Sequence, residues 1–167
     1  MAATKPNNTF LGLTTGKVLQ VVNSTTSAVA TGTTTSPEDD TIPQNTEGNE
    51  FLTLAITPAS ASNKLFIEIS CCFSHSDTSS SDMVMALFQD STANALASAS
   101  CGRQHTTNIA QSHSFNHYMA AGTTSATTFK VRIGADASGT TTLNGVSGGR
   151  KHGGVMSSSI TISEISA

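Results

Sequence analysis

Charged residues are scarce in this 167-residue sequence: Asp, Glu, Lys and Arg make up 11% of it, against about 25% in an average soluble protein. The eight Lys and Arg residues are scattered along the chain, and the formal net charge is −3. A nucleic-acid-binding protein gathers basic side chains on one face, because the phosphate backbone supplies most of the attraction. The sequence therefore predicts no nucleic-acid partner.

Long hydrophobic runs and catalytic motifs are also missing. No apolar run of 18 or more residues occurs, and Met1 is followed by a polar stretch instead of the apolar core of a signal peptide. We therefore expect synthesis in a cytoplasm and no membrane insertion. No serine lies in Gly-x-Ser-x-Gly, no Gly-Lys-Ser/Thr follows a glycine loop, and no cysteine has a nucleophile signature around it. We expect neither enzymatic activity nor a cofactor.

Hydroxyl side chains take the place of the missing charges and aromatics. Aromatic residues make up 5% of the chain and Trp is absent, whereas there are 26 threonines and 24 serines. Thr is β-branched and favours strands, while Ser and Gly favour turns. This composition predicts an all-β protein.

Three cysteines, Cys71, Cys72 and Cys101, leave one thiol unpaired under any internal pairing. The adjacent Cys71 and Cys72 point to opposite faces of a strand. We expect buried free thiols.

Alternating apolar residues predict several strands. The clearest lies over residues 65–73, where Leu65, Ile67, Ile69, Cys71 and Phe73 share one face. Residues 83–88 are apolar on both faces, which predicts a central strand buried on both sides. Further strands are expected near residues 17–22, 50–56, 113–119, 129–133, 140–143 and 157–165.

The remaining segments are expected to be less regular. Residues 74–82 predict a loop, 91–100 are a candidate helical turn, and 145–154 are expected to form a Gly-rich surface loop. Residues 23–36 fit either a polar strand or a loop.

About eight short strands separated by turns favour an antiparallel jelly-roll sandwich spanning residues 17–167. Residues 1–16 are interpreted as an N-terminal docking arm with Phe10, Leu11 and Leu13 as apolar anchors. Bulky apolar side chains are few for a sandwich of this size. We therefore expect burial between symmetric copies to supplement the core.

Several segments, in order, resemble a group of phage tail-fibre and virion-surface modules. Gly-Lys-Val-Leu-Gln-Val at 16–21 is similar to the group's opening strand, and Leu-Ala-Ile-Thr-Pro at 54–58 followed by Ser-Asn-Lys-Leu at 62–65 is similar to its middle. Thr-Ser-Ala-Thr-Thr-Phe-Lys-Val at 124–131, Thr-Leu-Asn-Gly at 142–145 and the segment 158–165 resemble its later strands. The resemblance implies a jelly-roll, tumour-necrosis-factor-like head that forms a homotrimer.

Together these features predict a structural protein on the surface of a bacteriophage virion. Because about 16 residues precede the first strand, we expect a small decoration or cement protein of the capsid more than a full-length fibre. The alternative is a tail-fibre knob or receptor-binding head that contacts host surface glycans. The expected partners are copies of the chain itself, phage capsid or tail proteins and, for the alternative, a glycan.

Candidate contact residues follow from this interpretation. Phe115 and Tyr118, with the three arm residues, are the expected trimer or partner contacts, and Arg150, Lys151 and His152 form a candidate ligand loop. No metal site is predicted. His113 and His117, four residues apart on one strand face, are weak candidates: one of them placed on a trimer axis would bring three imidazoles together, enough for a Zn, Ni or Fe site. His75, Asp77 and Asp82 are a weaker calcium alternative, because they lack the spacing of a calcium loop. The exposed acids at 38–40 favour a solvated turn over a glycosidase pair.

Overall fold

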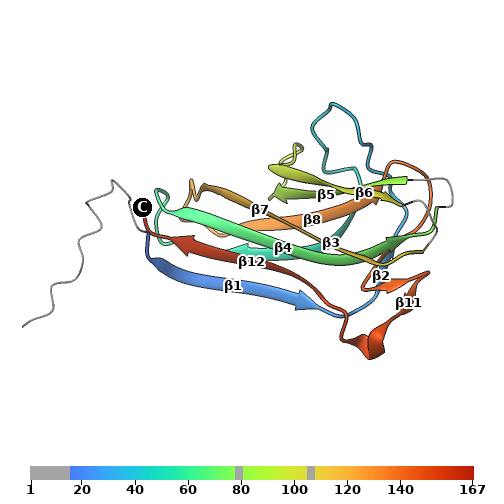
Figure 1. The fold of residues 1–167 in the computed structure, drawn as a ribbon. Helices are drawn as coiled ribbons and strands as arrows, with labels where there is room; N and C mark the ends of the chain where they lie inside the picture. The colour runs from blue at the N-terminus through green and yellow to red at the C-terminus, as the bar shows by residue number, and fades with distance from the viewer. Residues whose placement is uncertain (1–15, 78–80, 105–107) are drawn as a thin grey trace, which may run out of the picture.

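The computed structural model describes residues 16–77, 81–104 and 108–167. Within them the chain forms two large antiparallel sheets packed face to face and a separate two-stranded sheet (Figure 1). The long strands are β1 (Val18–Thr26), β3 (Asn49–Ile56), β4 (Lys64–His75), β5 (Ser81–Gln89), β6 (Ala97–Gln104), β7 (Gln111–Ala120), β8 (Thr127–Ala135) and β12 (Ser158–Ile165). The short elements are β2 (Ala30–Gly32), β9 (Thr141–Leu143), β10 (Gly145–Val146), β11 (Gly149–Arg150) and the 3-10 helix η2 (His152–Gly154).

The eight long strands pair in a nested order. The first pairs with the last, β1 with β12, and then β3 pairs with β8, β4 with β7 and β5 with β6. One sheet therefore contains β1, β12, β4 and β7, with β9 and β2 continuing it beside the end of β4. The other sheet has the order β3-β8-β5-β6. This nested pairing defines an antiparallel jelly roll, which confirms the predicted fold class.

The core lies between the two sheets and follows the predicted alternation. On β4, Leu65, Ile67, Ile69, Cys71 and Phe73 are each at most 2% exposed. Phe129, Val131 and Ile133 on β8 face them from the other sheet and are fully buried. Each such side chain contributes about 1.5–3 kcal/mol through burial.

Strand β5 is buried on both faces, as predicted. Met83, Met85 and Leu87 belong to the core, while Val84 and Phe88 point the other way and are also buried. The long connection 33–48 between β2 and β3 covers this second face and rises above β5 and β6 in Figure 1. It is held there by backbone hydrogen bonds that join 43–45 to 93–95.

Two expectations about irregular segments, 74–82 and 91–100, need correction. Strand β4 continues to His75 and β5 begins at Ser81, so the predicted loop 74–82 is shorter than expected. The candidate helical turn at 91–100 is wrong, because β6 begins at Ala97 and pairs with β5. Sheet pairing has overridden the helical preference of the alanines here.

The Ser/Thr-rich stretch 23–36 is both strand and loop. Its first residues complete β1, which ends at Thr26, and Ala30–Gly32 form β2. Residues 145–154, expected to be a loop, fold into the β10–β11 hairpin and η2. Glycine supports this tight path: Gly153 and Gly154 adopt positive φ angles of 64° and 92°.

All three cysteines are buried free thiols, as predicted. Cys71 belongs to the core cluster, whereas the neighbouring Cys72 lies on the opposite side of β4. The described residues contain no helix of the length and apolarity that crossing a bilayer requires.

Two buried polar side chains tie distant segments together. Glu164 on β12 is fully buried and accepts hydrogen bonds from Gln20, Asn63 and the Ala59 backbone N–H. Asn144 is also fully buried. Its amide donates to the carbonyls of residues 26 and 28 and accepts from the Ser158 hydroxyl. Each cluster satisfies groups that would be costly to bury alone.

Candidate oligomer interface

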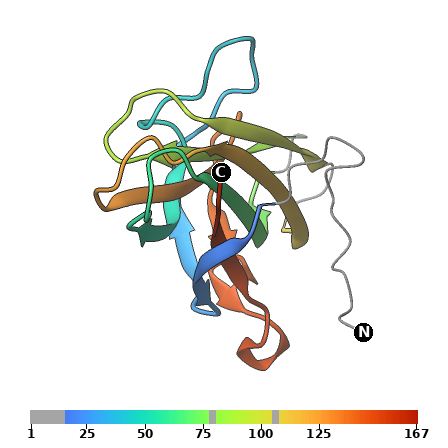
Figure 2. The same cartoon turned by 90° about the vertical axis from the view of Figure 1, so that its left-hand side faces the viewer.

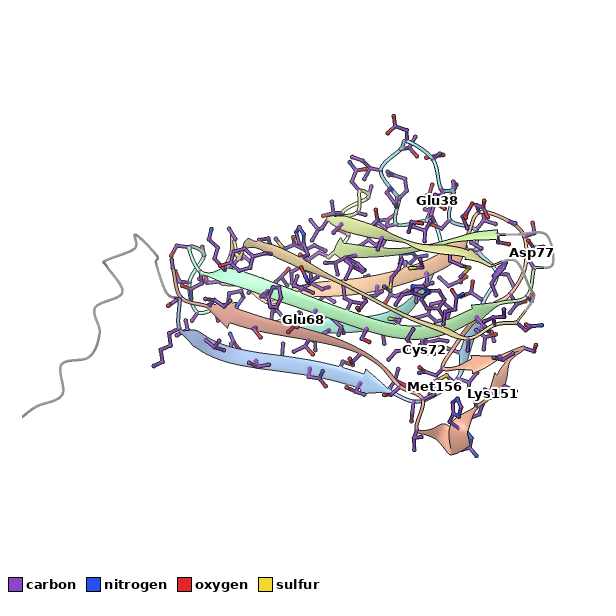
Figure 3. All side chains as sticks on the ribbon, in the orientation of Figure 1. Glu38, Glu68, Cys72, Asp77, Lys151 and Met156 are labelled. Carbon is purple, nitrogen blue, oxygen red and sulfur yellow. The ribbon has the colours of Figure 1, made fainter. Side chains whose placement is uncertain are left out.

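The described residues leave most of one sheet face of the sandwich uncovered. Because side chains alternate along a strand, the residues between the core positions of β1, β12, β4 and β7 point away from the other sheet. We call this surface the outer face. Lys64 and Glu68 carry its only formal charges, and Figure 3 labels Glu68 on β4. Where such a face also carries apolar side chains, exposing it to water costs free energy that few charged groups offset.

An apolar row crosses the outer face near one end. The strand register places Val21, Ser163, Phe66 and Tyr118 side by side on the four strands. Val21 is 57% exposed and Tyr118 55% exposed. The rings of Phe66 and Tyr118 lie 6.4 Å apart at their centroids with 54° between their planes, a tilted aromatic pair.

The apolar character continues toward the start of β1. Val18 is 53% exposed and Leu19 45% exposed. A register shift lies between Val18 and Gln20, so a bulge turns this part of the strand. The exposed apolar residues of β1 thus gather toward the start of the strand, next to Gly16 and Lys17.

Polar side chains make up the next two rows. Asn23, Thr161, Glu68 and Asn116 form one row, and Thr25, Ser159, Ser70 and Ser114 form the other. Between β12, β4 and β7 these rows border a shallow hollow of about 470 Å³. Oxygen and amide groups therefore lie directly beside the apolar row.

The structure separates the two aromatic contacts that the sequence placed together. Tyr118 lies on the outer face, whereas Phe115 pairs with Ile69 and packs half-buried against the core. The two residues are three positions apart on a strand and so face opposite sides. Tyr118 is available to a partner on this face and Phe115 is not.

The two histidines of β7 also face inward. His113 and His117 pair with Cys71 and Ile67, both core residues. The His113 ring stacks at a tilt on Phe73, 5.2 Å between centroids, and burial lowers its pKa. Four residues of strand separate the two imidazoles by about 13 Å, too far apart to bind one metal ion within a chain.

The candidate ligand loop is exposed at one tip of the molecule. Arg150, Lys151 and His152 all lie on the surface around β11 and η2, and Val155 beside them is 82% exposed. Figure 2 shows this hairpin projecting from the sandwich, on the side opposite the connection 33–48. The three basic residues are therefore brought together, but far from the apolar row.

The other candidates are not assembled into a site. His75 is buried at the end of β4, and Asp77 accepts a hydrogen bond from Ser81. In the parts of the chain that the structure describes, no three His, Cys, Asp or Glu side chains gather as metal ligands. The arm residues Phe10, Leu11 and Leu13 lie outside the described residues.

The sequence reasoning missed most of the outer face. Phe66, Val21, Val18 and Leu19 were not among the candidate contacts, although Phe66 stood as a large aromatic on the polar side of the clearest strand. The outward position of Phe66 could therefore have been predicted from the sequence. The alignment of these residues into one row could not, because it depends on the register of strands far apart in the chain.

No protein-family model matches the chain. No curated protein matches it either. Similar solved structures include the C-terminal domain of EclA, described as a sugar-binding protein, with 13% identity, a TM-score of 0.41 and coverage of 77% of this chain and 81% of that chain. The Eiger TNF of S. frugiperda has 11% identity and a TM-score of 0.48, covering 86% of this chain and 92% of that one.

A viral protein is also among the solved structures that are similar to this chain. The VP2 subviral particle of infectious bursal disease virus has 13% identity and a TM-score of 0.38, and the match covers 99% of this chain but 43% of that chain. At identities below 25% and TM-scores below 0.5, these three likenesses carry no argument about what the chain binds or does. Its own strand order defines it as an antiparallel jelly-roll module.

Proposed function

We propose that this chain is a non-enzymatic structural protein of a bacteriophage virion. It assembles as a homotrimer on the virion surface and decorates or cements the capsid. The proposal rests on one observation: the apolar row of Val21, Phe66 and Tyr118 on a sheet face that carries two charged side chains. Contiguous exposed apolar patches on soluble proteins are typical of contact surfaces.

Self-association by the outer face accounts for this row. A tyrosine that is more than half exposed in its own chain becomes an effective anchor when a second copy covers it, since aromatic residues dominate interface energetics. Burial contributes about 25 cal/mol per Å² of apolar surface, and a stable interface buries about 800 Å² on each partner. Closed cyclic symmetry satisfies every copy at once, and the homotrimer follows from the resemblance stated above.

Particle binding tests the decorating role. Purified protein is mixed with capsids that lack it and sedimented, and the same is done with Tyr118→Lys. We expect the unmodified protein to sediment with the capsids at saturable stoichiometry. Tyr118→Lys should bind the capsids far more weakly, because it loses its contacts with neighbouring copies of the chain. Absence of the protein from the capsid fraction at every concentration would overturn the decorating role.

A second candidate function is a receptor-binding head. It is favoured by the projecting tip, where Arg150, Lys151 and His152 are exposed beside Val155. The cations Arg150 and Lys151 on a projecting hairpin suit an anionic surface glycan. Binding of the purified protein to host cells, lost in Arg150→Ser/Lys151→Ser, would favour this function. Capsid binding that is unchanged in the same variant would favour decoration.

A further inference from the structure

Strand β1 forms an open edge of its sheet. It pairs with β12 on one side, and no other described strand pairs with it on the other (Figure 1). Its nine residues, Val-Leu-Gln-Val-Val-Asn-Ser-Thr-Thr, contain no charge and no proline. Such an edge presents backbone N–H and C=O groups on which another strand can pair.

Natural proteins usually protect their edge strands with charged side chains, proline or a bulge. Apart from the bulge between Val18 and Gln20, β1 carries none of these. At the edge of the other sheet, β3 carries Glu50, which lies 3.7 Å from Lys130 and 3.9 Å from Arg132. A charged group of this kind disfavours addition of a further strand. On β1 the exposed large apolar side chains are Val18, Leu19 and Val21, and the exposed polar ones, Asn23 and Thr25, are uncharged.

A strand-like segment lies immediately upstream. Residues 9–15, Thr-Phe-Leu-Gly-Leu-Thr-Thr, contain no charge and no proline and include three large apolar residues. Fully extended, the fifteen residues before Gly16 reach about 50 Å, more than the roughly 30 Å length of a nine-residue strand. These fifteen residues are therefore long enough to lie along the whole of one β1 edge.

The point where this segment leaves the domain is fixed. The Lys17 N–H donates to the Ser166 hydroxyl and the Ser166 N–H donates to the Lys17 carbonyl, both at 2.9 Å. A Cβ on Gly16 would lie 2.2 Å from a methyl carbon of Ile165, so the backbone here is pressed against the end of β12. Folding back onto its own β1 would require a reversal at these fixed residues. Pairing with a neighbour requires none.

We propose that residues 9–15 of one copy add a strand to the β1 edge of a neighbouring copy. This deepens the proposed homotrimer and rests on it. The backbone of the arm pairs with the open edge, and Leu11 and Leu13, which share one face of the added strand, lie beside Val18 and Val21. Main-chain bonds give such strand addition its affinity and alternate side chains give it its register. The arm thus interlocks the copies.

Hydrogen exchange measured by mass spectrometry tests the added strand. The full chain is compared with a variant lacking residues 1–15, and β8 amides serve as the control for an intact core. We expect exchange within β1 to be at least tenfold slower in the full chain, with β8 unchanged. The variant Leu11→Asp should exchange like the truncated form. The matched variant Asn8→Asp, which adds the same charge outside residues 9–15, should exchange like the full chain. Equal β1 exchange in the full and truncated chains would overturn the proposal.

A second measurement identifies which copy supplies the strand. A photo-crosslinking residue replaces Leu11 in a mixture of ¹⁴N and ¹⁵N chains that has been unfolded and reassembled. Crosslinks to β1 peptides of mixed isotope composition support exchange between copies, and crosslinks confined to one isotope contradict it. Light scattering on the same sample separates the two hypotheses: a monomer overturns the proposed function, whereas a trimer with unprotected β1 overturns the arm alone.

Discussion

The side-chain amide of Asn63 donates a hydrogen bond of 2.5 Å to the carboxylate of Glu164, 101 residues further along the chain. Gln20 donates to the same carboxylate at 2.6 Å. These three residues belong to the opening, middle and closing segments on which the resemblance to virion-surface modules rests. Their meeting at one buried carboxylate gives those segments a structural role: they fasten β1 and the β3–β4 connection to β12.

Replacing Glu164 by Ala should destabilise the fold strongly. A hydrogen bond to a charged group contributes about 1.5–3 kcal/mol, and the buried Asn63 amide would lose its acceptor. We expect the free energy of unfolding in urea to fall by about 3 kcal/mol. Asn63→Ala should cost less, and the double variant should show non-additive losses. A fall below about 1 kcal/mol for Glu164→Ala would contradict this role of the cluster.

Stability should decrease in two steps as the pH falls. Burial lowers the pKa of His75, against opposing effects of Asp77, the Ala137 backbone and Asp136, and burial also lowers the pKa of His113. A histidine with a folded pKa below its unfolded value of about 6.5 resists protonation, so stability is present above that pH and is lost below it. We expect the thermal midpoint to fall between pH 7 and pH 5.5. In His75→Gln/His113→Gln the thermal midpoint should change less between these two pH values. An unchanged pH dependence of the midpoint in this variant would mean that other groups cause the step.

The second step belongs to Glu164. Burial alone would raise its pKa, but hydrogen bonds from Asn63, Gln20 and the backbone N–H groups of residues 59 and 60 outweigh burial and lower it. A carboxylate with a depressed folded pKa stabilises the fold above its unfolded value of about 4.3, and that stability is lost as the pH falls further. Glu164→Gln should remove this acid step while leaving the histidine step unchanged. Denaturation curves recorded between pH 5 and pH 2.5 would check it.

The thiols should be inert in the native protein. Burial, as the main cause, raises the pKa of Cys71 and of Cys101 to about 12, so neither forms the reactive thiolate near neutral pH. A thiol reagent at pH 8 should label neither residue in the folded state and all three cysteines after unfolding. Rapid native labelling of Cys71 or Cys101 would show that the sheets open locally.

The two aromatic residues of β7 should respond in opposite ways. Phe115→Ala removes a ring packed against the core and should lower the unfolding free energy by about 2 kcal/mol. Tyr118→Lys changes an outward side chain and should leave the stability of the isolated subunit within about 0.5 kcal/mol. Urea titrations at low protein concentration distinguish them. A large loss for Tyr118→Lys would mean that this residue supports its own chain.

Local patterns predicted most of the fold, because alternation reports the two faces of a strand directly. Residues 65–73 and 83–88 show this: the first alternates as expected, and the second is buried on both sides. The cover over Val84 and Phe88 was not predictable, since the connection 33–48 has no periodic pattern. The helical turn predicted for the Ala-rich segment at the start of β6 was wrong, because pairing with β5 outweighs the helical preference of the alanines.

The candidate interface was only partly predictable. Tyr118 was named from the sequence and lies on the exposed outer face, but Phe115 was grouped with it although a separation of three puts the two on opposite faces. Val21 and Phe66 reach Tyr118 only through the pairing of β1, β12, β4 and β7. Such register between segments about 50 residues apart or more is set by tertiary packing, so local pattern could not supply it.

Size-exclusion chromatography with light scattering tests the central claim most directly. A homotrimer held by the outer face should have three times the 17.1 kDa mass of one chain at micromolar concentration. Tyr118→Lys should elute as a folded single subunit. A mass of 17.1 kDa for the unmodified protein, or an undiminished trimer in the variant, would contradict assembly through this face.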